Sequence, residues 1–79
     1  MKARVTVTLK SGVLDPQGKA IEGALGSLGF AGVSGVRQGK VFDFDIAETD
    51  PATAANLLQD MCEKLLANTV IEDYRIEMV

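Results

Sequence analysis

Residues 2–20, KARVTVTLKSGVLDPQGKA, contain a strand signal followed directly by a helix signal. Polar and apolar residues alternate strictly from residue 2 to residue 10, which predicts a strand with one buried face. Ser11 and Gly12 break this alternation, and Asp15-Pro16 then supplies an N-cap followed by a proline at the first helical position. We therefore expect a first helix over residues 15–28, with Gly29 as its C-terminal cap.

The same Asp-Pro signal recurs at residues 50 and 51 and predicts a second helix over residues 50–67, which Asn68 ends. The apolar residues of this helix cover about half of its circumference, whereas a helix lying on one sheet needs little more than about 100°. The surplus side, with Cys62, Ala55 and Leu66, therefore either contacts another subunit or packs beneath a loop. Residues 73–79 alternate again and predict a last strand.

The segment between the two helices allows two structures. Val36, Phe42, Phe44 and Ile46 keep one apolar phase, but polar residues interrupt it around Gly39. Either a hairpin turns near Gln38-Gly39, or one long bent strand carries its polar middle past the edge of the sheet. Periodicity alone leaves both structures open.

These elements predict the α+β class, as one domain over residues 1–79. We expect a ferredoxin-like β-α-β(β)-α-β order, with an antiparallel sheet and both helices on one face. The opposite face of the sheet is expected to carry mixed charges: Lys2, Arg4, Asp43, Asp45, Arg75 and Glu77. A chain of 79 residues buries a small core, and an apolar content of 47% suits a dimer.

Composition excludes several classes of partner. The formal net charge of −3 repels nucleic-acid phosphates and anionic lipids, and only four aromatic residues are present for base stacking. The alternating N-terminus does not resemble a signal peptide, and no apolar run approaches the roughly 18 residues needed to span a bilayer. A single cysteine suggests a reducing compartment. We expect a soluble, cytoplasmic protein without nucleic-acid or membrane partners.

No residue pattern predicts catalysis, and we expect no catalytic, cofactor-binding or metal-binding residues. Histidine is absent, which removes the commonest general base and metal ligand. Cys62 lies alone in an apolar helical stripe, which is typical of a core or interface residue. Asp43, Asp45 and Glu48 could gather a hard cation such as Mg²⁺, but without a glycine-bent ligand loop they are more typical of a solvated face.

The segment from Gly12 to Lys19 looks like a phosphate-binding loop but lacks its chemistry. Five residues, not four, separate its first glycine from the Gly-Lys pair, and Ala20 stands where a Mg²⁺-binding Ser or Thr belongs. The Asp15 carboxylate would also repel a phosphate from the helix N-terminus. We expect Val13 and Leu14 to meet another protein instead, and the turn with Arg37 and Lys40 to form a basic tip or an ordinary exposed turn. The candidate subunit interface comprises Gly12, Val13, Leu14, Asp15, Arg37, Lys40, Cys62 and Leu66.

Three segments together resemble the PurS family, the small subunits of three-component phosphoribosylformylglycinamidine synthase. They are LKSGVLDPQGKA at residues 9–20, VRQGK at residues 36–40, and MCEKLLAN at residues 61–68 leading to VIEDY at residues 70–74. The match runs in order along nearly the whole chain.

The resemblance implies a part in purine biosynthesis without catalytic residues on this chain. A glutaminase, PurQ, releases ammonia from glutamine, and a synthetase, PurL, uses ATP and Mg²⁺ to place it on formylglycinamide ribonucleotide. A PurS-like dimer is expected to hold the two enzymes together and to assist ammonia transfer.

A small-molecule-sensing module of the ACT type, which binds an amino acid near the loop after its first strand, is the alternative. RNA binding through the sheet conflicts with the acidic balance and the few aromatic residues.

Overall fold

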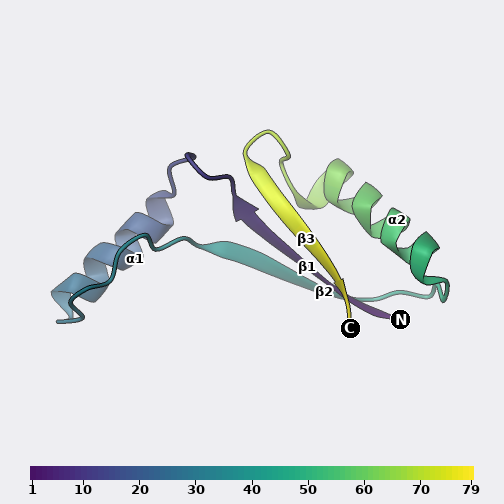
Figure 1. The fold of residues 1–79 in the computed structure, drawn as a ribbon, viewed down its shortest axis with the longest axis horizontal. Helices are drawn as coiled ribbons and strands as arrows, with labels where there is room; N and C mark the ends of the chain where they lie inside the picture. Colours follow the sequence, from purple (N-terminus) through teal and green to yellow (C-terminus); the bar gives the residue numbers. More distant parts are fainter.

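The structure, a computed structural model, describes all 79 residues. Its elements follow the predicted order (Figure 1): β1 Lys2–Leu9, α1 Pro16–Ser27, β2 Gly39–Asp45, α2 Pro51–Met61, a π-helical turn Cys62–Leu66, and β3 Glu72–Met78. Both helices begin after the predicted N-caps, because Asp15 accepts a hydrogen bond from the Gly18 N–H and Asp50 accepts one from the Thr53 N–H. The predicted α+β class and the first and last strands are confirmed.

The three strands form one sheet in the order β2-β1-β3, and both neighbouring pairs are antiparallel. Val5 of β1 lies at its centre, opposite Phe42 of β2 and Ile76 of β3. One face of the sheet packs against α2 and forms the core, whose buried residues are Ala3, Val5, Val7, Leu58, Cys62 and Ala67. No helix of the chain is long and apolar enough to cross a membrane.

The hairpin near Gln38-Gly39, one of the two structures that the sequence left open, does not form. Residues 33–38 are outside the sheet, and the chain enters it without reversing direction. β2 runs antiparallel to β1, as the predicted antiparallel sheet requires, and only the optional fourth strand is absent. A long strand is also incorrect, since only residues 39–45 pair. Gly39 permits this entry, because a Cβ atom there would lie 2.6 Å from the carbonyl oxygen of Val7.

The prediction that both helices cover one face is also wrong, because α1 projects away from the sheet as an arm (Figure 1). The molecule measures 48 × 25 × 15 Å, with a radius of gyration of 15.9 Å. A compact chain of this length would have a radius of gyration of about 12 Å. Only α2 packs on the sheet, and the apolar residues of α1 face outward.

The opposite face of the sheet carries the mixed charges expected from the sequence. Three ion pairs lie along it: Lys2 with Asp45 at 3.8 Å, Arg4 with Asp43 at 2.8 Å, and Arg75 with Glu77 at 3.2 Å. All six side chains are largely exposed, so solvent screens these pairs and they contribute little to stability.

The π-helical turn changes which side of the second helix is free. Ala67 N–H donates to the carbonyl of Cys62, five residues earlier, at 3.0 Å. Each residue in this wider turn advances by less than the roughly 100° of an α-helix, so Leu66 rotates toward the core and Leu65 rotates outward. Leu65 is 83% exposed and Cys62 is fully buried. The surplus apolar side is therefore that of Leu57 and Leu65, not that of Cys62.

Candidate functional site

The groups that could have supported catalysis are separated or engaged. Asp43 and Asp45 pair with Arg4 and Lys2, and the Glu48 carboxylate accepts hydrogen bonds from the next two backbone N–H groups. The structure gathers no group of three side chains that could hold a metal ion. Burial raises the pKa of the Cys62 thiol, which keeps it protonated and unreactive. The site must therefore be sought among surfaces that contact other molecules.

The root of the arm is held by Asp15, a residue that is only 5% exposed. One carboxylate oxygen accepts a hydrogen bond from the Gly18 N–H at 2.9 Å, and the other accepts one from the Gln38 N–H at 2.7 Å. The bond from Gln38 and then that from Gly18 hold the pKa of this carboxyl below its ordinary value. Asp15 therefore fills the helix N-terminus where an anion would bind, and it ties the start of α1 to the segment that returns to the sheet.

Further contacts fix the direction of the arm. The Glu22 carboxylate accepts a hydrogen bond from the Val36 N–H at 3.1 Å, which holds α1 beside the returning segment. The Arg37 guanidinium donates to the carbonyls of Leu9 and Lys10 at 3.4 Å and 3.0 Å. Arg37 therefore joins two segments of the chain, whereas the sequence left open a basic tip or an ordinary exposed turn.

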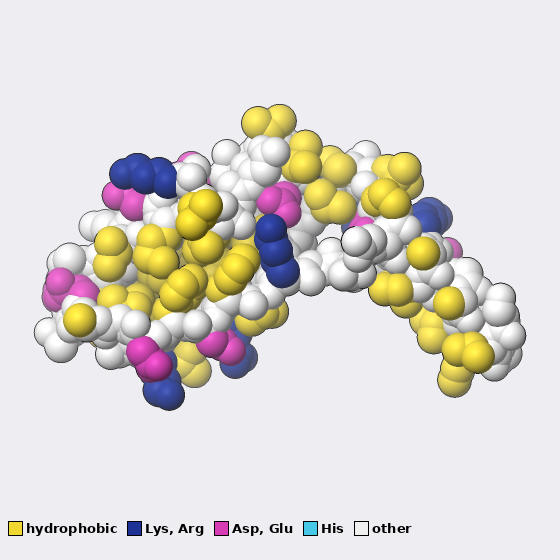
Figure 2. All heavy atoms as spheres, turned by 180° about the vertical axis from the view of Figure 1, so that it is seen from behind, with side chains coloured by type: hydrophobic (Ala, Val, Ile, Leu, Met, Phe, Trp, Pro, Cys, Tyr) yellow, Lys and Arg dark blue, Asp and Glu magenta, His cyan; other side chains and the backbone are white.

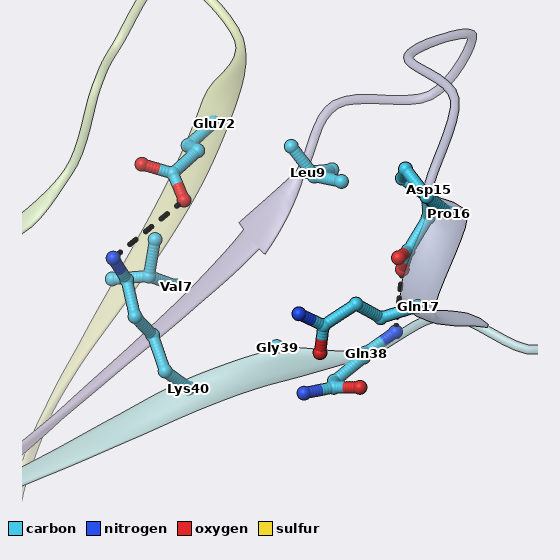
Figure 3. A pocket seen from close by; sticks show the side chains of 9 residues that line it. All are labelled: Val7, Leu9, Asp15, Pro16, Gln17, Gln38, Gly39, Lys40 and Glu72. Atoms are coloured by element: carbon cyan, nitrogen blue, oxygen red, sulfur yellow. Dashed lines mark hydrogen bonds and ion pairs between the residues drawn. The ribbon is translucent and has the colours of Figure 1, made fainter. Parts of the chain in front are cut away.

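A polar pocket of about 350 Å³ lies between the arm root and the sheet (Figure 3). Val7 and Leu9 contribute its apolar wall, while Gln17 and Gln38 line it from the arm side. Lys40 Nζ lies 3.9 Å from the Glu72 carboxylate, and 5.9 Å from the centre of the Phe42 ring. The predicted residues Asp15, Arg37 and Lys40 therefore come together at this root.

Two apolar surfaces on one side of the molecule lack a partner (Figure 2). The first, the arm stripe, consists of Ile21, Leu25, Leu28 and Phe30, and Leu28 is 73% exposed. The second, the sheet trough, is the part of the apolar sheet face that α2 leaves open. The trough is lined by Phe42, Phe44, Leu57, Met61, Leu65 and Leu66.

The trough lies on the β2 side of α2. The other side of that helix faces β3, because Glu63 there lies close to Tyr74 of β3. Burial, and then Glu63, raise the pKa of the Tyr74 phenol. Figure 2 shows hydrophobic side chains gathered over this part of the molecule. The predicted residue Leu66 is half-buried here, whereas Cys62 lies in the core and has no free surface.

Comparisons with known proteins identify the family. The family model described as "PurS: Phosphoribosylformylglycinamidine (FGAM) synthase" matches residues 2–79. The chain is 51% identical over 77 residues to the PurS subunit of this synthase from Bacillus subtilis, which covers 98% of this chain and 90% of the relative. The chain belongs to the PurS family. Its members are subunits of FGAM synthase, a glutamine-dependent ligase of purine biosynthesis.

Solved PurS structures share the extended shape of this chain. A B. subtilis PurS structure matches with a TM-score of 0.85 and 51% identity, over 96% of this chain and 94% of that one. A chain in a structure of PurLQS from Thermotoga maritima matches with a TM-score of 0.89 and 29% identity, over 99% of this chain and 95% of that one. Because these matches cover α1 and the sheet together, the projecting arm is a feature of PurS chains.

Sequence reasoning missed the sheet trough and the outward stripe of α1. The periodicity of Ile21, Leu25 and Leu28 did indicate an apolar face, but we assigned that face to the chain's own sheet. No short motif signals the position of Leu65, because the π-turn that exposes it is a local departure from helical spacing.

A substitution at Gly18 tests how closely the first turn of α1 packs against the returning segment at Val36. A Cβ atom at this position would lie 2.3 Å from the Val36 carbonyl oxygen, whereas one at Gly23 would meet no atom within 4 Å. We expect Gly18→Ala to lower the free energy of unfolding by about 1–3 kcal/mol through overpacking. Gly23→Ala, the matched control, should raise it by up to about 1 kcal/mol through helix propensity. Thermal and urea unfolding measure both, and equal effects would contradict the close contact.

The lowered pKa of the Asp15 carboxyl predicts that the free energy of unfolding depends on pH. Its pKa is lowered in the folded chain, so its stabilisation is fully present above the unfolded value of about 3.9 and is lost as pH falls through the folded pKa. Asp15→Ala should therefore unfold more easily than the parent at pH 7, and the difference should shrink below about pH 4. Urea unfolding across this range measures it. A difference that does not change with pH would show that the charge is unimportant.

Proposed function

We propose that this chain is a non-catalytic assembly subunit that joins a PurQ-like glutaminase to a PurL-like synthetase. The observation that carries the proposal is a chain with two uncovered apolar surfaces and no grouped catalytic side chains. Large exposed apolar patches on a small domain are typical of protein–protein contacts. Membership of the PurS family indicates the reaction of the complex. The glutaminase releases ammonia from glutamine, and the synthetase, with ATP and Mg²⁺ bound, places it on formylglycinamide ribonucleotide. In that assembly the chain also assists ammonia transfer.

The first contact is between two copies of the chain. The arm stripe of one copy is an amphipathic helix face, and the sheet trough of the other is an open apolar face beside a single helix. Placing the arm in the partner's trough gives each sheet the second helix that its own chain withholds, and a two-fold axis makes the exchange reciprocal. Full burial of each large apolar side chain contributes roughly 1.5–3 kcal/mol, and the exchange buries several such residues per copy.

The second contact is with the enzymes. The solved assembly described as PurLQS from T. maritima contains a chain that matches this one over nearly its whole length. We infer that this chain enters an equivalent complex. Residues of the predicted interface that the arm exchange leaves outside, Gly12, Val13 and Leu14, are available for these contacts.

An amino-acid-sensing module is the second candidate, and the polar pocket at the arm root favours it. Lys40 and Glu72 offer opposite charges for the carboxylate and ammonium of an amino acid. Saturable thermal stabilisation of this chain alone by glutamine would support sensing, while an unchanged melting temperature would leave assembly as the sole function.

Leu28→Glu tests the exchange of arms. Leu28 is exposed in the single chain, so the charge should leave folding intact while it prevents burial in a partner's trough. We expect sedimentation equilibrium to show a monomer, with circular dichroism unchanged. Val41→Glu, which adds the same charge at an exposed position of the opposite sheet face, is the matched control and should remain a dimer. A dimeric Leu28→Glu chain would contradict the exchange.

Co-purification tests the assembly itself. The chain should elute with its glutaminase and synthetase when ATP, Mg²⁺ and glutamine are present, and glutamine-dependent activity should require all three proteins. Full glutamine-dependent activity of the two enzymes without this chain would overturn the proposed function.

A further inference from the structure

The π-turn at the end of α2 forms an apolar groove, which we call the π-turn groove. It has a volume of about 330 Å³ and is lined by Leu57, Asp60, Met61, Lys64, Leu65 and Leu66. Residues in the π-turn advance by less than the roughly 100° of an α-helix, so Leu65 lies closer to the line of Leu57 and Met61 than regular helical spacing would place it. Turns of this kind are frequent at functional sites.

The lining of the π-turn groove favours one kind of occupant. Its two charged residues, Asp60 and Lys64, pair with each other at 4.0 Å, so the groove offers no unmatched charge. The Met61 thioether makes favourable contacts with aromatic rings. An apolar cavity of about 150 Å³ holds one benzene molecule, and the groove is larger than this. The groove therefore suits a neutral aromatic side chain.

Phe30 at the free end of the arm is such a side chain. It is 58% exposed, whereas the other three aromatic residues, Phe42, Phe44 and Tyr74, are partly buried against the core. Figure 2 shows hydrophobic side chains along the arm as far as its free end. Phe30 is therefore the one aromatic ring of the chain that its own core does not cover.

The backbone of Phe30 is fixed by the C-terminal cap of α1. Gly29 has a φ of +92°, its N–H donates to the carbonyl of Gly26 at 3.1 Å, and the Phe30 N–H donates to the carbonyl of Leu25 at 3.0 Å. These two bonds are those of a Schellman motif. A ring on a fixed backbone loses less conformational freedom on binding than one on a flexible loop, which favours its use as an anchor.

The ring and the groove of one chain are held apart. Figure 1 shows α1 and α2 at opposite ends of the molecule, which measures 48 Å along its longest axis. The hydrogen bonds of Asp15 hold the arm in this direction. Each chain therefore has one free ring and one open groove, and a two-fold axis between two copies fills both grooves at once.

The area of this contact supports a second copy as the occupant. A stable interface buries about 1,600 Å² in total, and two rings with two grooves contribute roughly 600 Å² of it. The rest of the arm stripe, placed in the sheet trough, adds to the same interface. A single ring placed in one groove, without the reciprocal contact, would bury only half of this area.

We infer that the π-turn groove receives the Phe30 ring of a second copy of this chain. This inference rests on the proposed contact between two copies and deepens it. It fixes how the arm lies in the trough, because the free end of the arm must reach the α2 wall beside Leu65. It also gives the π-turn a role, since the turn forms the groove that prevents the arm from sliding along the trough.

A double-mutant cycle between Phe30→Ala and Leu65→Ala tests the inference. Sedimentation equilibrium gives the dissociation constant of the dimer for the parent, the two single variants and the double variant. We expect each single substitution to raise this constant about ten-fold or more, because each removes one side of a buried aromatic contact. The double variant should be within about two-fold of the weaker single variant, since substitutions of residues in direct contact are not additive.

Val41→Ala is the control, because Val41 is 56% exposed, close to the value for Phe30, and lies on the opposite face of the sheet. Its dissociation constant should match that of the parent. A variant with altered circular dichroism is replaced by an isotope-filtered NMR experiment on the parent. Intermolecular NOEs from the Phe30 ring to the methyl groups of Met61 and Leu65 are then expected.

Several outcomes would overturn the inference while the parent remains a dimer. They are an unchanged dissociation constant for Phe30→Ala, effects of the two substitutions that multiply in the double variant, and the absence of these intermolecular NOEs. If the parent chain sediments only as a monomer, the proposed contact between two copies fails instead.

Discussion

The Asp15 carboxylate is the interaction on which the shape of the molecule depends. Its two oxygens hold the first turn of α1 and the Gln38 N–H together, so the helix and the returning segment leave the sheet as one unit. Gly18 allows the close approach that these bonds require, and Arg37 fastens the returning segment to the end of β1. Polar contacts at the root, not apolar packing along the helix, therefore set the direction of the arm.

An open arm has a direct consequence for the sheet. The chain buries the face beneath α2 but leaves the neighbouring part, around Phe42 and Phe44, without a helix. The π-turn adds to this open area by rotating Leu65 away from the core. The chain therefore has both an amphipathic helix without a sheet and a sheet face without a second helix. Its proposed role as an adaptor follows from these two uncovered surfaces, and it does not require catalytic residues on this chain.

Local sequence signals predicted the elements well, because each depends on neighbouring residues. The alternation of residues 2–10 and the two Asp-Pro pairs indicated β1 and both helix starts to within about a residue. The arm could not be predicted in this way, since Ile21, Leu25 and Leu28 show an apolar face but not which copy's sheet covers it. Periodicity left a hairpin near Gln38-Gly39 open, and it does not form because Gly39 serves close strand approach and not a turn. The exposure of Leu65 could not be predicted, because five-residue hydrogen bonding leaves no periodic signal.

The most direct test of the account is an isotope-filtered NMR experiment on a mixture of methyl-labelled and unlabelled chains. The account predicts intermolecular NOEs between the Ile21 and Leu25 methyl groups of one copy and the Phe42 and Phe44 rings of the other. If these NOEs arise only within one chain, the arm folds back onto its own sheet and the account is contradicted.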